Sequence, residues 1–272
     1  MMDLFQSEIF ANLAYIIASM LFIFGLKQLG SPETAQRGNL ISSSGMLLAV
    51  LVTLISNQII SYEWLVIGLV LGILVGTSAA SFVKMTSMPE LVALFNGFGG
   101  IASLLVGSAE YLGTGSLGLI SLTAIFLTLI IGGITFSGSL VAYGKLSEIL
   151  PGKQITFKGQ RIVLVAIFIA ALLFGAQLIF NFQMVEGWNP LFSFLLLISF
   201  SLVIGLLITL PIGGADMPVI IALLNSYSGL AASAAGFVIN NNVLIVAGAL
   251  VGASGLIPVS YTHLTLPTKS RG

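Results

Sequence analysis

Apolar runs long enough to cross a bilayer follow one another along almost the whole chain. A spanning helix needs roughly 20 mostly apolar residues, and inside the hydrocarbon its backbone groups must pair within the segment itself. Nine runs are predicted to span, at about residues 11–29, 39–57, 64–83, 89–111, 118–145, 161–180, 190–210, 217–239 and 243–257, of which the ninth is short, as expected of a truncated span. The sequence therefore predicts an all-α polytopic membrane protein, in which residues 1–257 form a bundle of nine transmembrane helices.

The composition agrees with this class and excludes others. Charged residues make up only 7% of the chain, against about 25% in ordinary soluble domains, and the mean hydropathy is +1.13. The chain has no cysteine, which excludes disulfides, thiol catalysis and cysteine-ligated metals. Because basic and acidic residues balance, no nucleic-acid surface is expected. The high apolar content predicts that the lipid bilayer surrounds the chain.

The charges between the predicted helices are sorted by side. One set of alternate loops carries the basic residues Lys27, Arg37, Lys84, Lys145, Lys153, Lys158 and Arg161. The opposite set carries Asp3, Glu8, Glu63, Glu110 and Glu186, with no basic residue. Because cytoplasmic loops are enriched in Lys and Arg, the N-terminus is predicted outside and the C-terminus in the cytoplasm.

Residues 258–272 differ abruptly in character from the apolar run before them. One interpretation is an authentic polar C-terminus. The other, which we favour, is a non-native tail, since VSYTHLTLPT resembles one translated frame of a transposon-end adapter used in sequencing libraries. This tail contains His263, the one histidine of the chain, and the native sequence is then expected to continue beyond Ile257.

One helix signature occurs twice. Residues 87–107 read SMPELVALFNGFGGIASLLVG, and residues 216–236 read DMPVIIALLNSYSGLAASAAG. As the fourth and eighth predicted helices, the two copies cross the membrane in the same direction, a parallel repeat of the kind that transporters use. The alternative is an old duplication retained for packing. The identical positions pair Met88, Pro89, Ala93, Leu94, Asn96, Gly100, Ala102 and Gly107 with Met217, Pro218, Ala222, Leu223, Asn225, Gly229, Ala231 and Gly236.

Each copy begins with a helix-start signal. SMPE at 87–90 has the spacing of a capping box, and DMP at 216–218 places an acidic cap at the positive end of the helix dipole. In the simplest interpretation Ser87 and Asp216 are caps and nothing more. Asp216 also has a functional interpretation, because IGGA at 212–215 gives it a flexible approach where a carboxylate could exchange protons or contact a docked domain.

An asparagine follows about two turns into each copy. A buried amide in a membrane helix is costly without a partner, so Asn96 and Asn225 are expected to face the bundle interior. They form either a structural clamp, in which each can bond the other, or a polar site that holds water or orients a titratable group. Ser228 shares the face of Asn225 and belongs to the same candidate site.

Small residues mark the expected packing faces, because glycines let membrane helices approach closely. Ser139 and Ser254 accompany these glycines, and a tight core with room for water is predicted there. No Walker loop, zinc ligand set or GxGxxG after a strand occurs, so no nucleotide or metal site is predicted in this chain. The packing glycines are Gly132 and Gly138 on the fifth predicted helix, Gly229 and Gly236 on the eighth, and Gly248 and Gly252 on the ninth.

Three stretches carry a specific resemblance. The chain closely resembles the membrane part of the beta subunit of proton-translocating NAD(P) transhydrogenase in the stretch IGGADMPVIIALLNSYSG and in the AASAAGFVINNNVLIVAGALVGASG that follows it. MPELVALFNGFGG and GGITFSGSLVAYGKL agree at the matching earlier places, and the resemblance covers nearly all of residues 10–257. It implies a translocase that couples hydride transfer between NADH and NADP to inward proton movement across the cytoplasmic (inner) membrane of a bacterium.

The resemblance also implies partners. The beta subunit of this family has nine membrane helices followed by a cytoplasmic NADP(H)-binding domain, which would lie beyond Ile257. The chain itself is then expected to bind no cofactor and to transfer no hydride, because NADP(H) and NAD(H) bind in that domain and in the partner alpha subunit. The assembled enzyme is implied to be a homodimer.

The resemblance places Asn225 and the position of Asn96 in a proton path and Asp216 at its cytoplasmic mouth. We add Ser228, Ser139 and Ser254 to that path. Many relatives carry a protonatable histidine where Asn96 stands, so the proton carrier is expected on a membrane helix of the alpha subunit.

Two other functions are compatible with the same residues. A repeat-built secondary transporter of a small solute predicts flux by this chain alone. A structural membrane anchor predicts that Asn96 and Asn225 clamp helices without taking part in transport.

Overall fold

The computed structural model describes residues 8–56, 62–113, 117–180 and 189–264, and the regular structure in these ranges is helical. The predicted acidic residues Asp3 and Glu186 and the last part of the predicted tail, 265–272, lie outside the described residues.

Nine α-helices and two short 3₁₀ helices make up the described residues. The 3₁₀ helices, η1 (Met85–Ser87) and η2 (Gly214–Asp216), directly precede α5 and α9. The nine predicted runs correspond to the α-helices with small shifts at their ends, except that the last helix continues to Leu264. The α-helices are α2 (Glu8–Leu29), α3 (Ala35–Ser56), α4 (Tyr62–Phe82), α5 (Met88–Leu112), α6 (Leu119–Leu146), α7 (Gln160–Phe180), α8 (Pro190–Thr209), α9 (Met217–Val238) and α10 (Asn242–Leu264).

The all-helical membrane class is confirmed in the described residues. Seven segments there are long and apolar enough to cross a membrane, within α2, α3, α5, α6, α7, α8 and the stretch Gly214–Val238. α4 and α10 contribute shorter apolar segments, Glu63–Ala79 and Asn242–Gly255.

The chain divides into two compact units, Met1–Val83 and Lys84–Gly272. In the first unit α2 and α3 pack along each other, and Ala11, Ala14 and Val52 are buried between them. The hydroxyls of Tyr15 and Thr53 share a hydrogen bond of 3.0 Å across the same contact. Buried apolar side chains, a hydrogen bond between hydroxyls and a close backbone approach at Gly25 and Gly38 thus join these two helices.

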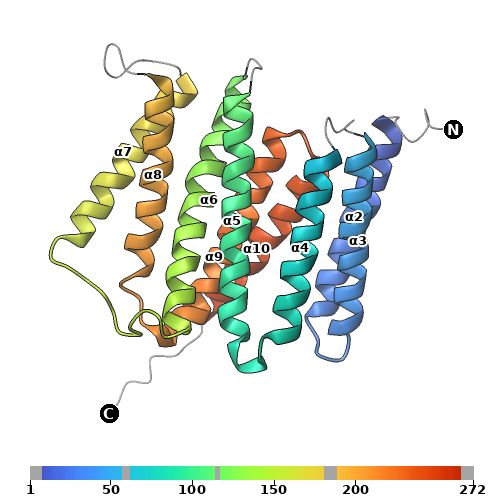
Figure 1. Cartoon of the computed structure of the whole chain (residues 1–272), viewed down its shortest axis with the longest axis horizontal. Helices are drawn as coiled ribbons and strands as arrows, with labels where there is room; N and C mark the ends of the chain where they lie inside the picture. Colours follow the sequence, from blue (N-terminus) through green and yellow to red (C-terminus); the bar gives the residue numbers. More distant parts are fainter. Residues whose placement is uncertain (1–7, 57–61, 114–116, 181–188, 265–272) are drawn as a thin grey trace. The chain divides into compact units, whose positions relative to one another are not determined.

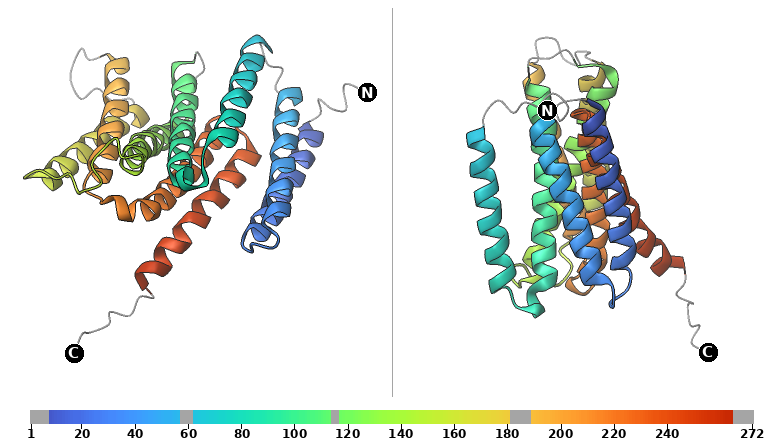
Figure 2. Two further views of the ribbon diagram at one scale, coloured as in Figure 1. Left: turned by 60° about the horizontal axis from the view of Figure 1, so that its bottom comes forward. Right: turned by 90° about the vertical axis from the view of Figure 1, so that its right-hand side faces the viewer.

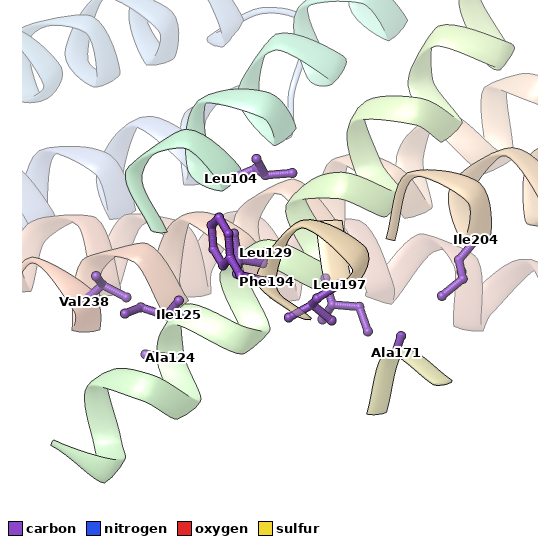
Figure 3. Close-up of a cluster of buried hydrophobic side chains, with 10 residues drawn as sticks. Leu104, Ala124, Ile125, Leu129, Ala171, Phe194, Leu197, Ile204 and Val238 are labelled. Atoms are coloured by element: carbon purple, nitrogen blue, oxygen red, sulfur yellow. The ribbon is translucent and has the colours of Figure 1, made fainter. Parts of the chain in front are cut away.

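The second unit is built around α6, which packs against α5, α7, α8 and α9 (Figure 1). α10 packs on α9 in the same unit. Figure 3 shows the apolar core of the unit, to which five different helices contribute side chains. Its fully buried members include Ile125 and Leu129 of α6 and Leu197 and Ile204 of α8. Because α6 touches four other helices of the unit, about half of its residues are buried.

The two copies of the repeated signature are α5 and α9, and they run in the same direction. Ala93 near the start of α5 shares a buried cluster with Met217 and Ile221 at the start of α9. Ala142, near the end of α6, belongs to the same cluster. α5 and α9 therefore begin at the end of the unit where α6 ends, as can be followed in Figure 2.

The starts of α5 and α9 differ from the prediction. Ser87 and Asp216 occupy the N-cap positions, and a proline lies in each first turn, but neither side chain accepts a capping hydrogen bond. A capping side chain normally needs an extended N-cap residue. Here a 3₁₀ turn leads into each helix, with ψ of 10° at Ser87 and −3° at Asp216. The expected side-chain caps are therefore wrong, and the Asp216 side chain is left free for other contacts.

Candidate functional site

The site begins with a close approach of two helix backbones. A Cβ atom added to Gly100 of α5 would lie 2.8 Å from the carbonyl oxygen of Gly132 of α6, and the reverse distance is also 2.8 Å. Neither position can accept a side chain without moving the helices apart. The predicted packing glycine Gly132 thus lies where α5 and α6 are in backbone contact.

This approach brings Asn96 of α5 against Ser139 of α6. Asn96 is only 8% exposed and Ser139 only 1%. The Nδ2 of Asn96 donates a hydrogen bond of 2.9 Å to the Oγ of Ser139. Two residues predicted separately for the proton path are therefore direct partners across a helix interface.

Ser228 of α9 joins the same site. Its hydroxyl donates to the backbone carbonyl of Asn96 at 3.2 Å. A Cβ on Gly99 would lie 3.3 Å from that hydroxyl, so the absence of a side chain at Gly99 leaves Ser228 room to reach α5. Three helices thus meet at Asn96 of α5, whose side-chain amide bonds α6 and whose backbone carbonyl accepts from α9.

Asn225 has a different environment from Asn96, although the two occupy equivalent repeat positions. Its chain neighbours Leu224 and Ser226 point to opposite sides, toward Gly138 of α6 and Gly252 of α10. Successive residues of a helix differ in direction by about 100°, so Asn225 projects between these contacts and is exposed. The expectation that both amides are buried is wrong for Asn225, and the two do not clamp each other.

The buried site contains acceptors that the described residues leave unpaired. Neither Oδ1 of Asn96 nor Oγ1 of Thr135 has a hydrogen-bond partner among them. Thr135 lies one turn before Ser139 on α6, on the same face. An amide oxygen and a hydroxyl can both accept from water or from a protonated group, and neither titrates near neutral pH. The site can therefore position a proton carrier and cannot replace it.

An apolar layer separates this site from Asp216. Ala93, Ala142 and Met217 are completely buried, and Ile221 is nearly so. Ala93 lies about one turn before Asn96 on α5, and Ala142 lies about one turn after Ser139 on α6. The four residues therefore pack nearer the starts of α5 and α9 than Asn96 does. Asp216 lies beyond this layer, exposed in η2. The structure thus places the predicted mouth and the predicted interior site on opposite sides of a closed apolar contact.

Four predicted glycines, on α9 and α10, lie in the contact between these two helices, whereas Gly138 of α6 faces Thr209 of α8 and Leu224 of α9. A Cβ on Gly229 would be 2.4 Å from the amide nitrogen of Gly252 and 2.7 Å from the carbonyl of Gly248. One on Gly236 would be 2.7 Å from the nitrogen of Ile245. Ser254, which we placed in the path, is exposed and bonds the carbonyl of Val251 in its own helix. It is not brought to the Asn96 site.

Lys145 is a residue whose role sequence reasoning missed. It was predicted as a loop charge, but it lies in the last turn of α6 and is only 3% exposed. Its Nζ donates to the carbonyls of Leu210 at 2.7 Å, Ile212 at 2.5 Å and Lys153 at 3.2 Å. The sequence did contain a signal for this role, a lysine in the last turn of a predicted helix that is followed by a Pro-Gly turn. The last carbonyls of a helix have no partner within it, and a lysine nearby can donate to such carbonyls.

The described residues contain no group of three His, Asp or Glu side chains placed to hold a metal ion. Two apolar pockets of about 490 and 520 Å³ border α6, and neither is lined by Asn96 or Ser139. The buried Asn96 site, at the contact between α5, α6 and α9, is therefore separate from these pockets.

Comparison with known proteins places this arrangement in a family. Residues 11–262 match the family described as NAD(P) transhydrogenase beta subunit. Two curated relatives from Rhodospirillum rubrum, both named NAD(P) transhydrogenase subunit beta, are 43% identical over 256 residues. Each match covers 91% of this chain and 53% of the relative, so the chain spans about half the length of these relatives. The chain belongs to the NAD(P) transhydrogenase beta subunit family.

Proposed function

We propose that this chain is the proton-translocating membrane domain of an NAD(P) transhydrogenase. It couples inward proton movement to hydride transfer between NADH and NADP in nucleotide-binding domains outside residues 1–257. The observation that carries the proposal is the buried Asn96–Ser139 pair, which leaves an unpaired amide oxygen at the contact of three helices in a chain of this family. Buried polar groups in membrane helices commonly mark ion and proton pathways.

The proton carrier in this proposal comes from a partner. Asn96, Ser139 and Ser228 offer hydrogen bonds but no group that titrates near neutral pH. Asn225 is exposed on α9, and a membrane-exposed amide is stabilised by a polar partner on a neighbouring helix. A membrane helix of the alpha subunit with a histidine supplies that partner. Proton pumping that persists after every membrane histidine of the alpha subunit is replaced would contradict this assignment.

The apolar layer at Met217 and Ile221 is the gate in this mechanism. Hydrophobic constrictions block conduction because water does not fill them, and they conduct when the surrounding helices part. Asp216, exposed beyond the layer, is the point where a docked NADP(H)-binding domain can act on α9. Redox state in that domain then controls access from the cytoplasmic side to Asn96.

The setting of this domain follows from the charge pattern and the family. Nine spans, with the N-terminus outside and the C-terminus in the cytoplasm, place all the basic loops inside. The membrane is the cytoplasmic (inner) membrane of a bacterium, and the assembled enzyme is a homodimer with the alpha subunit. NADP(H) and NAD(H) bind outside this segment, which transfers no hydride by itself.

Replacing Asn225 by leucine tests the proposal. In the full-length subunit assembled with its partner, Asn225→Leu is expected to impair NADPH-linked proton pumping while membrane insertion is unchanged, because leucine keeps the branched shape of the side chain and removes the amide. Asn39→Leu, which removes an exposed amide from α3, is the matched control and should pump normally. Normal coupled pumping by Asn225→Leu would reject the proton path. Solute flux from this chain alone, without nucleotide, would favour a secondary transporter instead.

A further inference from the structure

The buried ammonium of Lys145, at the end of α6, binds three carbonyls in two backbone segments. Its three partners are the carbonyls of Leu210 and Ile212, just after α8, and of Lys153, in the segment that leads to α7. An ammonium group has three N–H donors, and each finds one acceptor here. Burying such a charge is costly unless its donors are satisfied, so this arrangement is specific to a lysine side chain at this position.

The segments that Lys145 joins are also bonded to each other. The Ile155 amide donates to the carbonyl of Leu210 at 3.1 Å, and the Gly214 amide donates to the carbonyl of Gly152 at 2.7 Å. Residues 152–155 and 210–214 therefore form a docked pair of segments, which we call the paired connection. The Leu210 carbonyl, which accepts from both Lys145 and Ile155, lies at the C-terminal end of α8, where the helix dipole favours a positive charge.

The paired connection leads directly into the functional helix. Gly214 begins η2, Asp216 ends it, and α9 starts at Met217. Ile212, whose carbonyl Lys145 binds, also packs against the apolar layer of Ala93, Ala142, Met217 and Ile221. A change in how this connection is held must therefore alter both the presentation of Asp216 and the packing of the layer.

We propose that Lys145 is a positioning residue, which holds the paired connection on the end of α6 and so fixes Asp216 and the start of α9 relative to the Asn96–Ser139 pair. The transport part of this inference rests on the proposed function, whereas the structural part does not. Lys145 touches no substrate and acts through the backbone that carries Asp216. Without its ammonium, the Ile212 and Lys153 carbonyls lose their donor, the Leu210 carbonyl keeps only the Ile155 amide, and the paired connection keeps only its backbone bonds.

Backbone hydrogen exchange of the membrane-inserted chain tests the structural part. Lys145→Met keeps the length of the side chain and removes all three donors. Hydrogen bonds to a charged group are among the strong ones, so losing three of them should let the paired connection open more often. The exchange rates of the Gly214 and Ile155 amides are therefore expected to rise by about tenfold or more. Lys158→Met removes a charge from an exposed side chain of the same segment and should leave exchange unchanged. Equal exchange in these two variants would overturn the proposal.

A second measurement covers the case in which Lys145→Met does not insert. In the unsubstituted chain the Gly214 and Ile155 amides must exchange far more slowly than an unstructured chain does, and unprotected amides would also overturn the proposal. Lys145→Arg supplies N–H donors at the same place and is expected to restore part of the protection.

Proton pumping tests the link to transport. In the assembled full-length enzyme, Lys145→Met should lower the number of protons moved per hydride transferred, and Lys145→Arg should recover part of it. An unchanged ratio in Lys145→Met would overturn the transport role. If the unsubstituted enzyme pumps no protons, the proposed function itself fails, and the exchange result still decides the structural part.

Discussion

Asn96 shows how one side chain acquires a role from its surroundings. Its amide is buried, donates to Ser139 and keeps an unpaired oxygen, while its backbone carbonyl accepts from Ser228. A hydrogen bond between membrane helices contributes only about 0.6 kcal/mol on average. The pair therefore contributes little to stability by itself, and its value lies in orienting the free oxygen.

The coupling between Asn96 and Ser139 gives a prediction at this scale. Ser139→Ala removes the acceptor and leaves a buried N–H unpaired, which should lower the free energy of unfolding by about 1–3 kcal/mol. Adding Asn96→Leu should cost less than the sum of the two single changes, because the amide that needed the acceptor is then absent. Denaturant unfolding in detergent micelles measures all three variants.

Ser103→Ala provides the control for that cycle. Ser103 lies on the same helix as Asn96, is buried, and bonds the carbonyl of Gly99 in its own helix. It should show no coupling with Asn96→Leu. Strict additivity for Asn96 and Ser139 would mean that the interhelical bond does not form in the folded protein.

The contact between elements is made chiefly by backbone against backbone. α9 and α10 approach so closely that glycines on both helices face each other, as α5 and α6 do at Gly100 and Gly132. In a membrane there is little hydrophobic force between helices, so close van der Waals packing carries much of the association. The buried hydroxyl of Ser226, which donates to the Gly252 carbonyl, adds a polar bond to the α9–α10 contact.

Two glycines of this contact should respond differently to the same substitution. Gly229→Ala places a Cβ against the backbone of Gly252 and Gly248, which cannot yield without separating the helices. It should destabilise the fold by about 1–3 kcal/mol, the usual cost of overpacking. Gly252→Ala meets the Leu230 side chain at 3.0 Å, which can rotate away, so its cost should be smaller. Unfolding in detergent compares the two, and equal costs would contradict the backbone contact.

At the scale of the whole molecule, the sorting of charge predicts the orientation in the membrane. Four basic residues of the second unit, Lys145, Lys153, Lys158 and Arg161, lie in or directly beside the connection between α6 and α7. The positive-inside rule predicts that this connection lies in the cytoplasm, together with the starts of α5 and α9. The paired connection and Asp216 then face the side where a nucleotide-binding domain would dock.

Single-cysteine labelling tests this orientation, because the chain has no cysteine of its own. Thr156→Cys lies in the exposed basic connection, and Gly118→Cys lies at the opposite end of α6, where an added side chain meets no atom within 4 Å. An impermeant maleimide should label Gly118→Cys from outside intact cells and Thr156→Cys only in inverted membranes. The reverse pattern would contradict the topology.

Local patterns in the chain predicted the helices and the close-packed glycines well. Runs such as 161–180 and 190–210 are recognisable because each carries its own apolar length and turn residues, and α7 and α8 match them closely. The side-chain caps at Ser87 and Asp216 were predicted wrongly, because a 3₁₀ turn before each helix changes the geometry of the cap. The environment of Asn225 was missed as well, since an identical motif predicts identical burial and gives no sign of which neighbours pack on it.

The sequence by itself determined the class of the molecule, the position of its helices and the parallel repeat, because apolar length, turn chemistry and glycine spacing act within or next to each segment. Tertiary structure alone decided that Asn96 is buried against Ser139 while Asn225 projects outward, and that Lys145 is buried on three carbonyls. These contacts join residues far apart in the chain, so they depend on how the helices rotate and pack. The same two amides therefore have different partners, because α6 covers the Asn96 side chain and the described residues leave that of Asn225 exposed.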